Sequence, residues 1–420
     1  VCLLSFLLSY SGTVEAGLSC VLPKEGVKKL GCTTMLKGEI TNVSVSGLVA
    51  CYIRDDNPSR GMLAKMCNMY KGKYFASDEE LAQWQDANVT NQESKKVVVD
   101  QNDLEKLKKT NKCMKCNLTN ADLVREDLKK ADLTGADLTG ADLTTAKLDN
   151  ADLTDANLTN VNLTKADLSK ANLTGANLAG ANLTGARMRT STLLGANLTK
   201  TNLTGADLSY GADLSKANLT GANLTKANLG RSSLNEAKLT DADLTKAKLG
   251  DTDLTNADLT KANLTGAYLT KANLTGADLT KANLTGANLV WANLTGATLT
   301  EANLTKAGLT GLDLTGVDLI GVDLTEANLR EANLAGVNLD GANLSEADLF
   351  NANLTKANLA RVNLNKVNLT ETNVTMGQVV EAILCRTQLP WGVDNSGCQK
   401  IANQESKKVV VDQNDLEKLK

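Results

Sequence analysis

The sequence predicts an all-β solenoid with four-sided coils, and three features of the chain support this fold class. A five-residue pattern, Ala-Asp/Asn-Leu-Thr/Ser-x, repeats from Cys116 to Met376. Aromatic residues make up only 3% of the 420 residues, and histidine is absent. Such a composition is too skewed for ordinary globular domains, whereas self-similarity at a fixed period is typical of solenoids.

The length of the period excludes a helix. Central apolar residues recur every five positions from Leu118 to Leu208, which makes 19 units, and from Leu214 to Val374, which makes 33 units. On an α-helix five residues advance by about 500°, so successive leucines would scatter around the axis and form no apolar face. In a short strand, by contrast, Ala and Leu point inward while the residue between them points outward.

The fifth residue of each unit, often Gly or Lys, must then turn the chain. One corner every five residues gives a coil of four sides and 20 residues, so the 52 units make about 13 coils. At the ~4.8 Å spacing of strands, these coils stack into a rod of roughly 60 Å. Two irregularities are expected: a corner must absorb the extra residue Gly211, and Glu126 occupies an inward position near the first coil.

This pattern resembles the pentapeptide-repeat family. The resemblance implies a right-handed quadrilateral β-helix over residues 116–376. Many members of that family place Phe at the centre of the unit, whereas this chain uses Leu almost throughout, with Met188 and Val374 as the exceptions. The segment from Ile383 to Cys398 resembles the terminal segment of exported cyanobacterial and plastid members.

The flanks of the repeat divide into further segments. In order, we expect a signal-peptide remnant, a small disulfide-containing domain, a lead-in helix with the N-terminal cap, and a C-terminal cap: residues 1–16, 17–90, 91–115 and 377–402. Residues 403–420 repeat residues 91–108 without change. The duplication indicates either a tandem or head-to-tail arrangement of solenoids or an artefact of sequence assembly.

Cysteines lie only at the two ends of the repetitive body. Eight remain once Cys2 is removed with the leader, and an even number at both ends predicts disulfides formed in an oxidising compartment. The Cys-x-x-Cys pair at 113 and 116 has no histidine and no second such pair beside it, so we expect a disulfide there and no metal or redox site. The disulfide candidates are Cys20, Cys32, Cys51, Cys67, Cys113, Cys116, Cys385 and Cys398.

Many repeat units contain Asn-x-Ser/Thr, the acceptor sequence for N-glycosylation in a eukaryotic secretory pathway. Because the Asn points outward, we expect it to accept a glycan; alternatively, Asn and Thr are simply suitable outward residues of a ladder. The glycosylation candidates are Asn42, Asn88, Asn117, Asn157, Asn162, Asn172, Asn182, Asn197, Asn202, Asn218, Asn223, Asn263, Asn273, Asn283, Asn293, Asn303, Asn343, Asn353, Asn368 and Asn373.

One side of the predicted rod differs from the others. Counting units in turn from 116–120 assigns each to a first, second, third or fourth face, and the third face carries a single acceptor sequence. Aromatic and arginine residues on an otherwise polar rod are typical of a protein contact surface. Looser selection on one face would produce the same pattern. The candidate contact residues are Arg187, Tyr210, Tyr268, Trp291, Arg330 and Phe350.

Catalysis is not expected. Without histidine, the Ser-His-Asp and Cys-His nucleophile systems and the commonest zinc sites are excluded. The net charge of −3 comes from interspersed residues and leaves no basic footprint for nucleic acid. The N-terminal apolar run is too short to span a bilayer. We therefore expect no enzyme, no cofactor, no metal site, no nucleic-acid partner and no membrane span.

The function that the sequence favours is that of an extracellular structural protein. In this hypothesis glycosylated solenoids associate end to end or laterally into filaments or arrays and build a fibre, sheath or matrix. The alternative is a monomeric protein-binding module of the thylakoid lumen or periplasm that binds its partner through the third face. DNA mimicry, as in family members that protect DNA gyrase, is a distant third, because those rods are strongly acidic and cytosolic.

Overall fold

The computed structural model describes residues 19–20, 50–52, 73–75 and 99–401, in two compact units, Val1–Val97 and Val98–Lys420. In the first unit three short strands form one sheet: β1 (Ser19–Cys20), β2 (Ala50–Tyr52) and β3 (Lys73–Phe75). Strand β2 lies in the middle, antiparallel to β1 and parallel to β3, and Cys20 is the register partner of Cys51.

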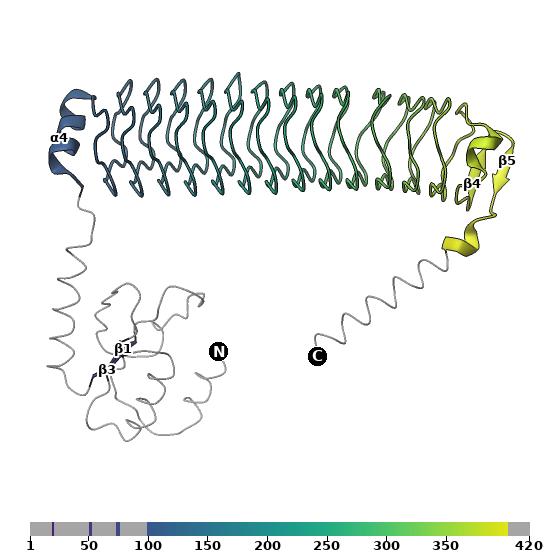
Figure 1. The fold of residues 1–420 in the computed structure, drawn as a ribbon, viewed down its shortest axis with the longest axis horizontal. Helices are drawn as coiled ribbons and strands as arrows, with labels where there is room; N and C mark the ends of the chain where they lie inside the picture. The colour runs from purple at the N-terminus through teal and green to yellow at the C-terminus, as the bar shows by residue number, and fades with distance from the viewer. Residues whose placement is uncertain (1–18, 21–49, 53–72, 76–98, 402–420) are drawn as a thin grey trace. The chain divides into compact units, whose positions relative to one another are not determined.

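The second unit is a stack of coils (Figure 1). Second-position residues along the stack pair in parallel with the residue 20 positions later, as Asn117 does with Asp137 and Asp137 with Asn157. With five residues per unit, a 20-residue spacing produces four ladders side by side. The chain therefore has the four-sided coil that the period predicts.

Within each unit the backbone alternates one strand residue with one tight turn. The N–H of the central Leu donates to the next coil, as from Leu158 to the Asn177 carbonyl at 2.7 Å. The fifth residue is left-handed, with φ of 63° at Gly135 and 56° at Lys165. That conformation costs a non-glycine residue about 1 kcal/mol or more, so the many Lys, Asn and Asp corners depend on the ladders that flank them.

The core consists of the first- and third-position side chains. These alanines and leucines form one continuous buried cluster that runs from Leu107 to Leu389. Each buried leucine contributes about 2 kcal/mol. Where a hydroxyl replaces the alanine, it donates to a main-chain carbonyl, as Thr201 Oγ1 does to the Leu178 oxygen at 2.8 Å. The interior is thus filled by small and medium side chains, and the hydroxyls that replace alanine are hydrogen-bonded.

Gly211 is accommodated at a corner, as expected. The pairing distance lengthens by one residue across it, from Asp167 with Arg187 to Asp207 with Asn228, and later returns to 20. Tyr210 and Gly211 have φ of 63° and 93°, so the corner is one residue longer and both residues are left-handed. The insertion leaves the four ladders in register.

Before the first coil stands helix α4 (Gln101–Thr110). The Asp100 side chain accepts the N–H of Asn102 at 2.9 Å and caps the helix, and Leu107 is fully buried in the core cluster. Lys108 forms an ion pair of 2.7 Å with Glu126. Glu126 thus occupies the inward first position of its unit, but its side chain is 35% exposed and is neutralised by a cation from α4. Among the described residues, no helix is long and apolar enough to cross a membrane.

The ladders extend beyond residues 116–376 at both ends. Lys112 already pairs with Asp132, while Ile383 pairs with Asn363 and Gln388 with Asn368. The repeat is difficult to recognise in the sequence of the C-terminal segment, because the residues at the second and fourth positions of the unit change. The buried residues Val379, Leu384 and Leu389 nevertheless keep the five-residue spacing. The elements in this C-terminal segment are the 3-10 helix η2 (Met376–Val379) and the antiparallel pair β4 (Thr387–Leu389) and β5 (Gly392–Asp394).

Candidate functional site

The structure places all six candidate contact residues on the third face. Arg187 and Tyr268 belong to its ladder, where Arg187 pairs with Asp167 and Tyr268 with Lys248. The other four occupy the fourth or fifth position of third-face units: Tyr210, Trp291, Arg330 and Phe350. The side chains of Tyr210 and Trp291 are 60% and 66% exposed, so the rings project from the rod and do not pack into it.

Three of these rings each form a cation–π contact with a cationic side chain of the preceding coil. Arg189 lies 5.5 Å from the centre of the Tyr210 ring, and Lys271 lies 5.4 Å from that of Trp291. Arg330 lies 4.4 Å from the centre of the Phe350 ring. At exposed sites such cation–π contacts stabilise by about 0.5–1 kcal/mol. The exposed aromatic residues are therefore partly ordered before any partner binds, which lowers the entropy cost of binding.

Arg189 and Asp207 form a hydrogen-bonded ion pair. Arg189 Nε donates to Asp207 Oδ2 at 2.6 Å. Burial raises the pKa of Asp207, but hydrogen bonds from Ser209 and Arg189 outweigh burial and leave that pKa below its usual value. The pKa of Arg189 is raised in turn by the same hydrogen bond and charge. Both groups stay ionised near neutral pH, which keeps Arg189 against Tyr210.

Trp391 also belongs to this face and was missed by counting units. Because Gln388 pairs with Asn368, the segment Thr-Gln-Leu-Pro-Trp is a third-face unit with Trp391 at its corner, 44% exposed. Extending the five-residue count from Val374 to Leu389 would have found it. Every aromatic residue between positions 112 and 391 therefore lies on the third face.

The third face also contains a hollow of about 480 Å³ that is open to solvent. It lies where the fourth position is glycine in two successive coils, at Gly230 and Gly250. Tyr210 and Tyr268 lie among the lining residues. The full lining is Ser209, Tyr210, Asn228, Gly230, Arg231, Lys248, Gly250, Asp251 and Tyr268.

The acceptor asparagines of the solenoid occupy the second position of their units, and most are on the first, second and fourth faces. Their Asn-x-Thr spacing builds a hydrogen-bonded ladder: Thr164 Oγ1 donates to Asn162 Oδ1 at 2.7 Å, and Asn162 Nδ2 donates to Thr144 Oγ1 at 2.8 Å. This ladder explains why Asn and Thr recur at this spacing even if no glycan is attached. Glycosylation of these asparagines stays a prediction. Asn42 and Asn88 lie outside the described residues.

Two disulfides join the cysteines that flank the repeat, Cys113 to Cys116 and Cys385 to Cys398. Cys113 and Cys116 fill core positions that Leu and Ala occupy in other units. Cys20 and Cys51 lie in β1 and β2, and Cys32 and Cys67 lie outside the described residues.

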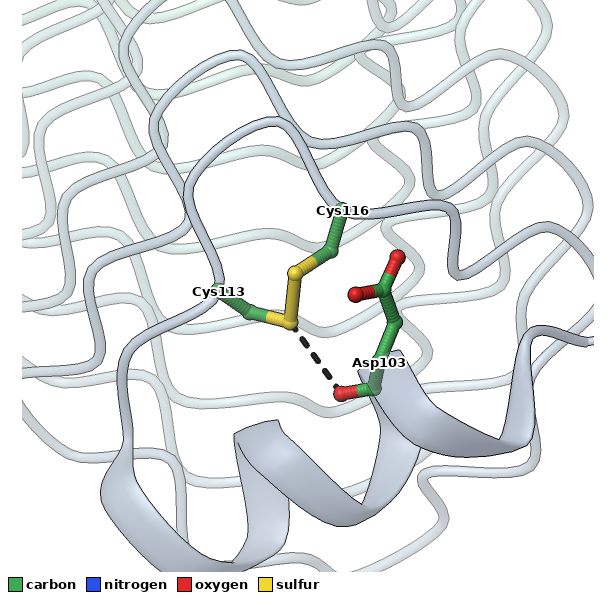
Figure 2. A group of neighbouring side chains, drawn as sticks. All are labelled: Asp103, Cys113 and Cys116. Atoms are coloured by element: carbon green, nitrogen blue, oxygen red, sulfur yellow. Dashed lines mark hydrogen bonds between the residues drawn. A yellow bond between two sulfur atoms is a disulfide. The ribbon is translucent and has the colours of Figure 1, made fainter.

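Figure 2 shows Asp103 of α4 beside the first disulfide. Its main-chain oxygen lies 3.2 Å from Cys113 Sγ, and its carboxylate accepts the N–H of Asn117 at 2.8 Å. The carboxylate and the two sulfurs lie within 4.8 Å of one another, as metal ligands would. Since the sulfurs are bonded to each other, they offer no thiolates, and the arrangement is a contact between α4 and the first coil.

Comparison with known families gives one result. The sequence profile of the family described as "Pentapeptide repeats" matches eight segments of the chain, which overlap except at residues 210–211. These are residues 112–150, 136–175, 171–209, 212–251, 247–286, 282–321, 313–349 and 347–384. Together they cover well over half of the chain and coincide with the ladders. No match was found among curated proteins.

Among solved structures, HetL is 35% identical over 58% of this chain and 90% of its own, with a TM-score of 0.35. HetL is a pentapeptide repeat protein of the cyanobacterium Nostoc sp. strain PCC 7120 involved in heterocyst differentiation regulation. Rfr23 of the cyanobacterium Cyanothece 51142 is 36% identical over 25% of this chain and 85% of its own, with a TM-score of 0.25. A thylakoid lumen protein of Arabidopsis thaliana is 26% identical over 32% of this chain and 72% of its own, with a TM-score of 0.14.

Proposed function

Because the chain belongs to the pentapeptide-repeat family, we propose that it is a non-enzymatic rod that binds a protein partner through its third face. The observation that carries the proposal is the placement of every solenoid aromatic on that face, three of them beside cations. Aromatic and arginine side chains are the residue types that dominate binding energy at protein interfaces. Members of the family are generally non-enzymatic.

We prefer this function to a fibre built end to end, because both ends of the ladders carry extra elements. At one end Leu107 of α4 reaches the core; at the other, β4 and β5 pair with each other. We propose that these segments cap the rod and remove the exposed strand edges that end-to-end stacking needs. The two disulfides support an exported location, such as the thylakoid lumen or periplasm, because disulfides persist in oxidising compartments.

Site-specific photo-crosslinking in the native cell extract tests the proposal. A benzoylphenylalanine at Trp291 is compared with one at Lys261, which occupies the same corner position on the first face. We expect a defined crosslinked partner from position 291 and none from position 261. Equal crosslinking from both positions, or none from either, contradicts the proposal. Crosslinks of the chain to itself, together with filaments in electron microscopy, would favour the structural fibre.

A further inference from the structure

The hollow on the third face exists because two stacked side chains are missing. The fourth position of a unit usually carries Thr or Ser, and within the solenoid it is glycine only at Gly230 and Gly250. These two residues belong to successive coils of the same face, since Asn228 pairs with Lys248. The two gaps therefore lie side by side and merge into one recess.

The backbone does not require glycine at either position. Neither residue has the left-handed φ of the corner glycines. A Cβ would meet its nearest atoms at 3.5 Å on Gly230 and at 3.6 Å on Gly250, which are ordinary contact distances. A threonine at either position would match most other units. The recess is thus not explained by the demands of the fold.

Its walls combine aromatic rings with positive charge. Tyr210 and Tyr268, 60% and 54% exposed, contribute to the lining. Arg231 Nε lies 3.8 Å from the carboxylate of Asp251, a loose pair at the rim. Lys248 makes no ion pair within the part of the chain that the structure describes. Its ammonium group is the lining cation that is left to meet a ligand.

The charge of the surrounding surface has the same sign. Third-face units from residue 186 to residue 291 carry five cationic side chains and two carboxylates, a net charge of +3, whereas the whole chain has a net charge of −3. The cationic residues are Arg187, Arg189, Arg231, Lys248 and Lys271, and the carboxylates are Asp207 and Asp251. A partner that matches this part of the face carries negative charge.

We propose that the recess receives an acidic side chain from an extended peptide segment of the partner protein. The carboxylate contacts Lys248, and Tyr210 and Tyr268 flank the neighbouring peptide residues. A protein segment fits better than a nucleic acid, because the carboxylates of Asp207 and Asp251 interrupt the cations that a phosphate backbone would need. This inference rests on the proposed function and names the chemistry of its binding site.

The test uses the full chain and a fluorescein-labelled dodecapeptide of alternating Glu and Ser with one central Phe. In an extended peptide this alternation places the Glu side chains on one side. Binding is compared for wild type, the double variant Gly230→Thr/Gly250→Thr, and Ala179→Thr, which adds the usual threonine on the first face. The same peptide with Lys in place of Glu and a twelve-nucleotide single-stranded DNA are the matched probes.

We expect wild type and Ala179→Thr to bind the acidic peptide alike, and the double variant to bind it about tenfold more weakly, as for loss of a charged hydrogen bond. Because both changes restore the repeat pattern, the thermal melt should stay at or above that of wild type. Equal binding by all three proteins would contradict the proposal that the recess binds the acidic side chain. In that case, weaker binding by Trp291→Ser/Phe350→Ser would still support the third face as the binding surface. If the acidic peptide does not bind, or if the Lys peptide or the DNA binds more tightly, the proposal that the partner segment is acidic is wrong.

Discussion

The coils from Cys113 to Leu289 and the coils around residues 292–322 share one repeat but differ in how closely they stack. In the first region Leu264 donates to the Asn283 carbonyl at 2.7 Å, and Asn283 donates back to Ala262 at 2.9 Å. This reciprocal pattern continues along all four ladders. Successive coils there lie as close together as hydrogen bonding allows.

In the second region two of the four ladders lack the hydrogen bonds from their central N–H groups, although on the first face Thr298 still pairs with Asp318. On the fourth and first faces, the N–H groups of Leu294 and Leu299 donate to no carbonyl of the next coil within the described chain. The remaining two faces stay closed, with Leu289 bonded to Gly308 at 2.9 Å and Leu304 to Asp323 at 2.7 Å. Figure 1 shows the wider spacing between coils in the green part of the stack.

The difference follows from the first position of the unit. This position is usually Ala, but three successive units after the opening carry Leu312, Val317 and Val322, all buried. Larger side chains stacked against Ala292 and Ala297 of the previous coil overpack the space that alanine fills. A lone valine is tolerated, since Val161 leaves its ladder closed. Close stacking of the coils therefore depends on alanine at the first position, while the central leucine provides most of the buried apolar surface.

The largest effect on the free energy of unfolding is expected when a central leucine is removed from the closely stacked region. Leu264→Ala should lower the free energy of unfolding by about 2–5 kcal/mol, because it leaves a cavity that tightly stacked coils cannot fill. Leu299→Ala, at the opening, should cost less, because its surroundings can collapse. Urea denaturation of both variants checks this. Equal costs would mean that the opening does not loosen the core.

An intermediate effect is expected from closing the opening. Leu312→Ala restores the usual residue on the fourth face, so the ladder bonds from the N–H groups of Leu294 and Asp313 can form there, each contributing about 0.5–1.5 kcal/mol. Losing the buried leucine side chain costs about 2 kcal/mol. The two contributions nearly cancel, so we expect the free energy of unfolding to change by about 1 kcal/mol or less, together with slower amide hydrogen exchange at Leu294. Unchanged exchange at Leu294 would show that Leu312 does not open the fourth-face ladder. The amide of Leu264, which is already hydrogen-bonded to the next coil, serves as the internal control.

The smallest expected effect is acid sensitivity in both regions. The pKa of Asp207 is lowered because hydrogen bonds outweigh burial, and that of Asp313 is lowered chiefly by the backbone N–H and hydroxyl of Thr315. A lowered pKa contributes stability that is complete above the unfolded value of about 3.9 and is lost as the pH falls through the folded value. Thermal melts should therefore fall below about pH 4, and less steeply in Asp207→Asn. An unchanged slope in that variant would contradict the assignment.

Much of the candidate site could be predicted from the order of residues. Counting in fives placed Tyr210 and Trp291 on one face, because a rigid period maps sequence position onto direction. Trp391 was missed, since the repeat is disguised after Val374 and only the pairing of Gln388 with Asn368 reveals its position. The recess was missed because Gly230 and Gly250 are ordinary residues singly and form a hollow only when stacked.

The sequence by itself determined the fold class, the buried Ala and Leu columns and the identity of each face, because these follow from a local period of five. Only the tertiary structure decided which side chains meet across coils. The cation–π pairs, the ion pair of Lys108 with Glu126, the recess and the open ladders all join residues about 20 positions apart. Such contacts depend on how closely successive coils stack, and that distance is set by packing throughout the coil and not by any single unit.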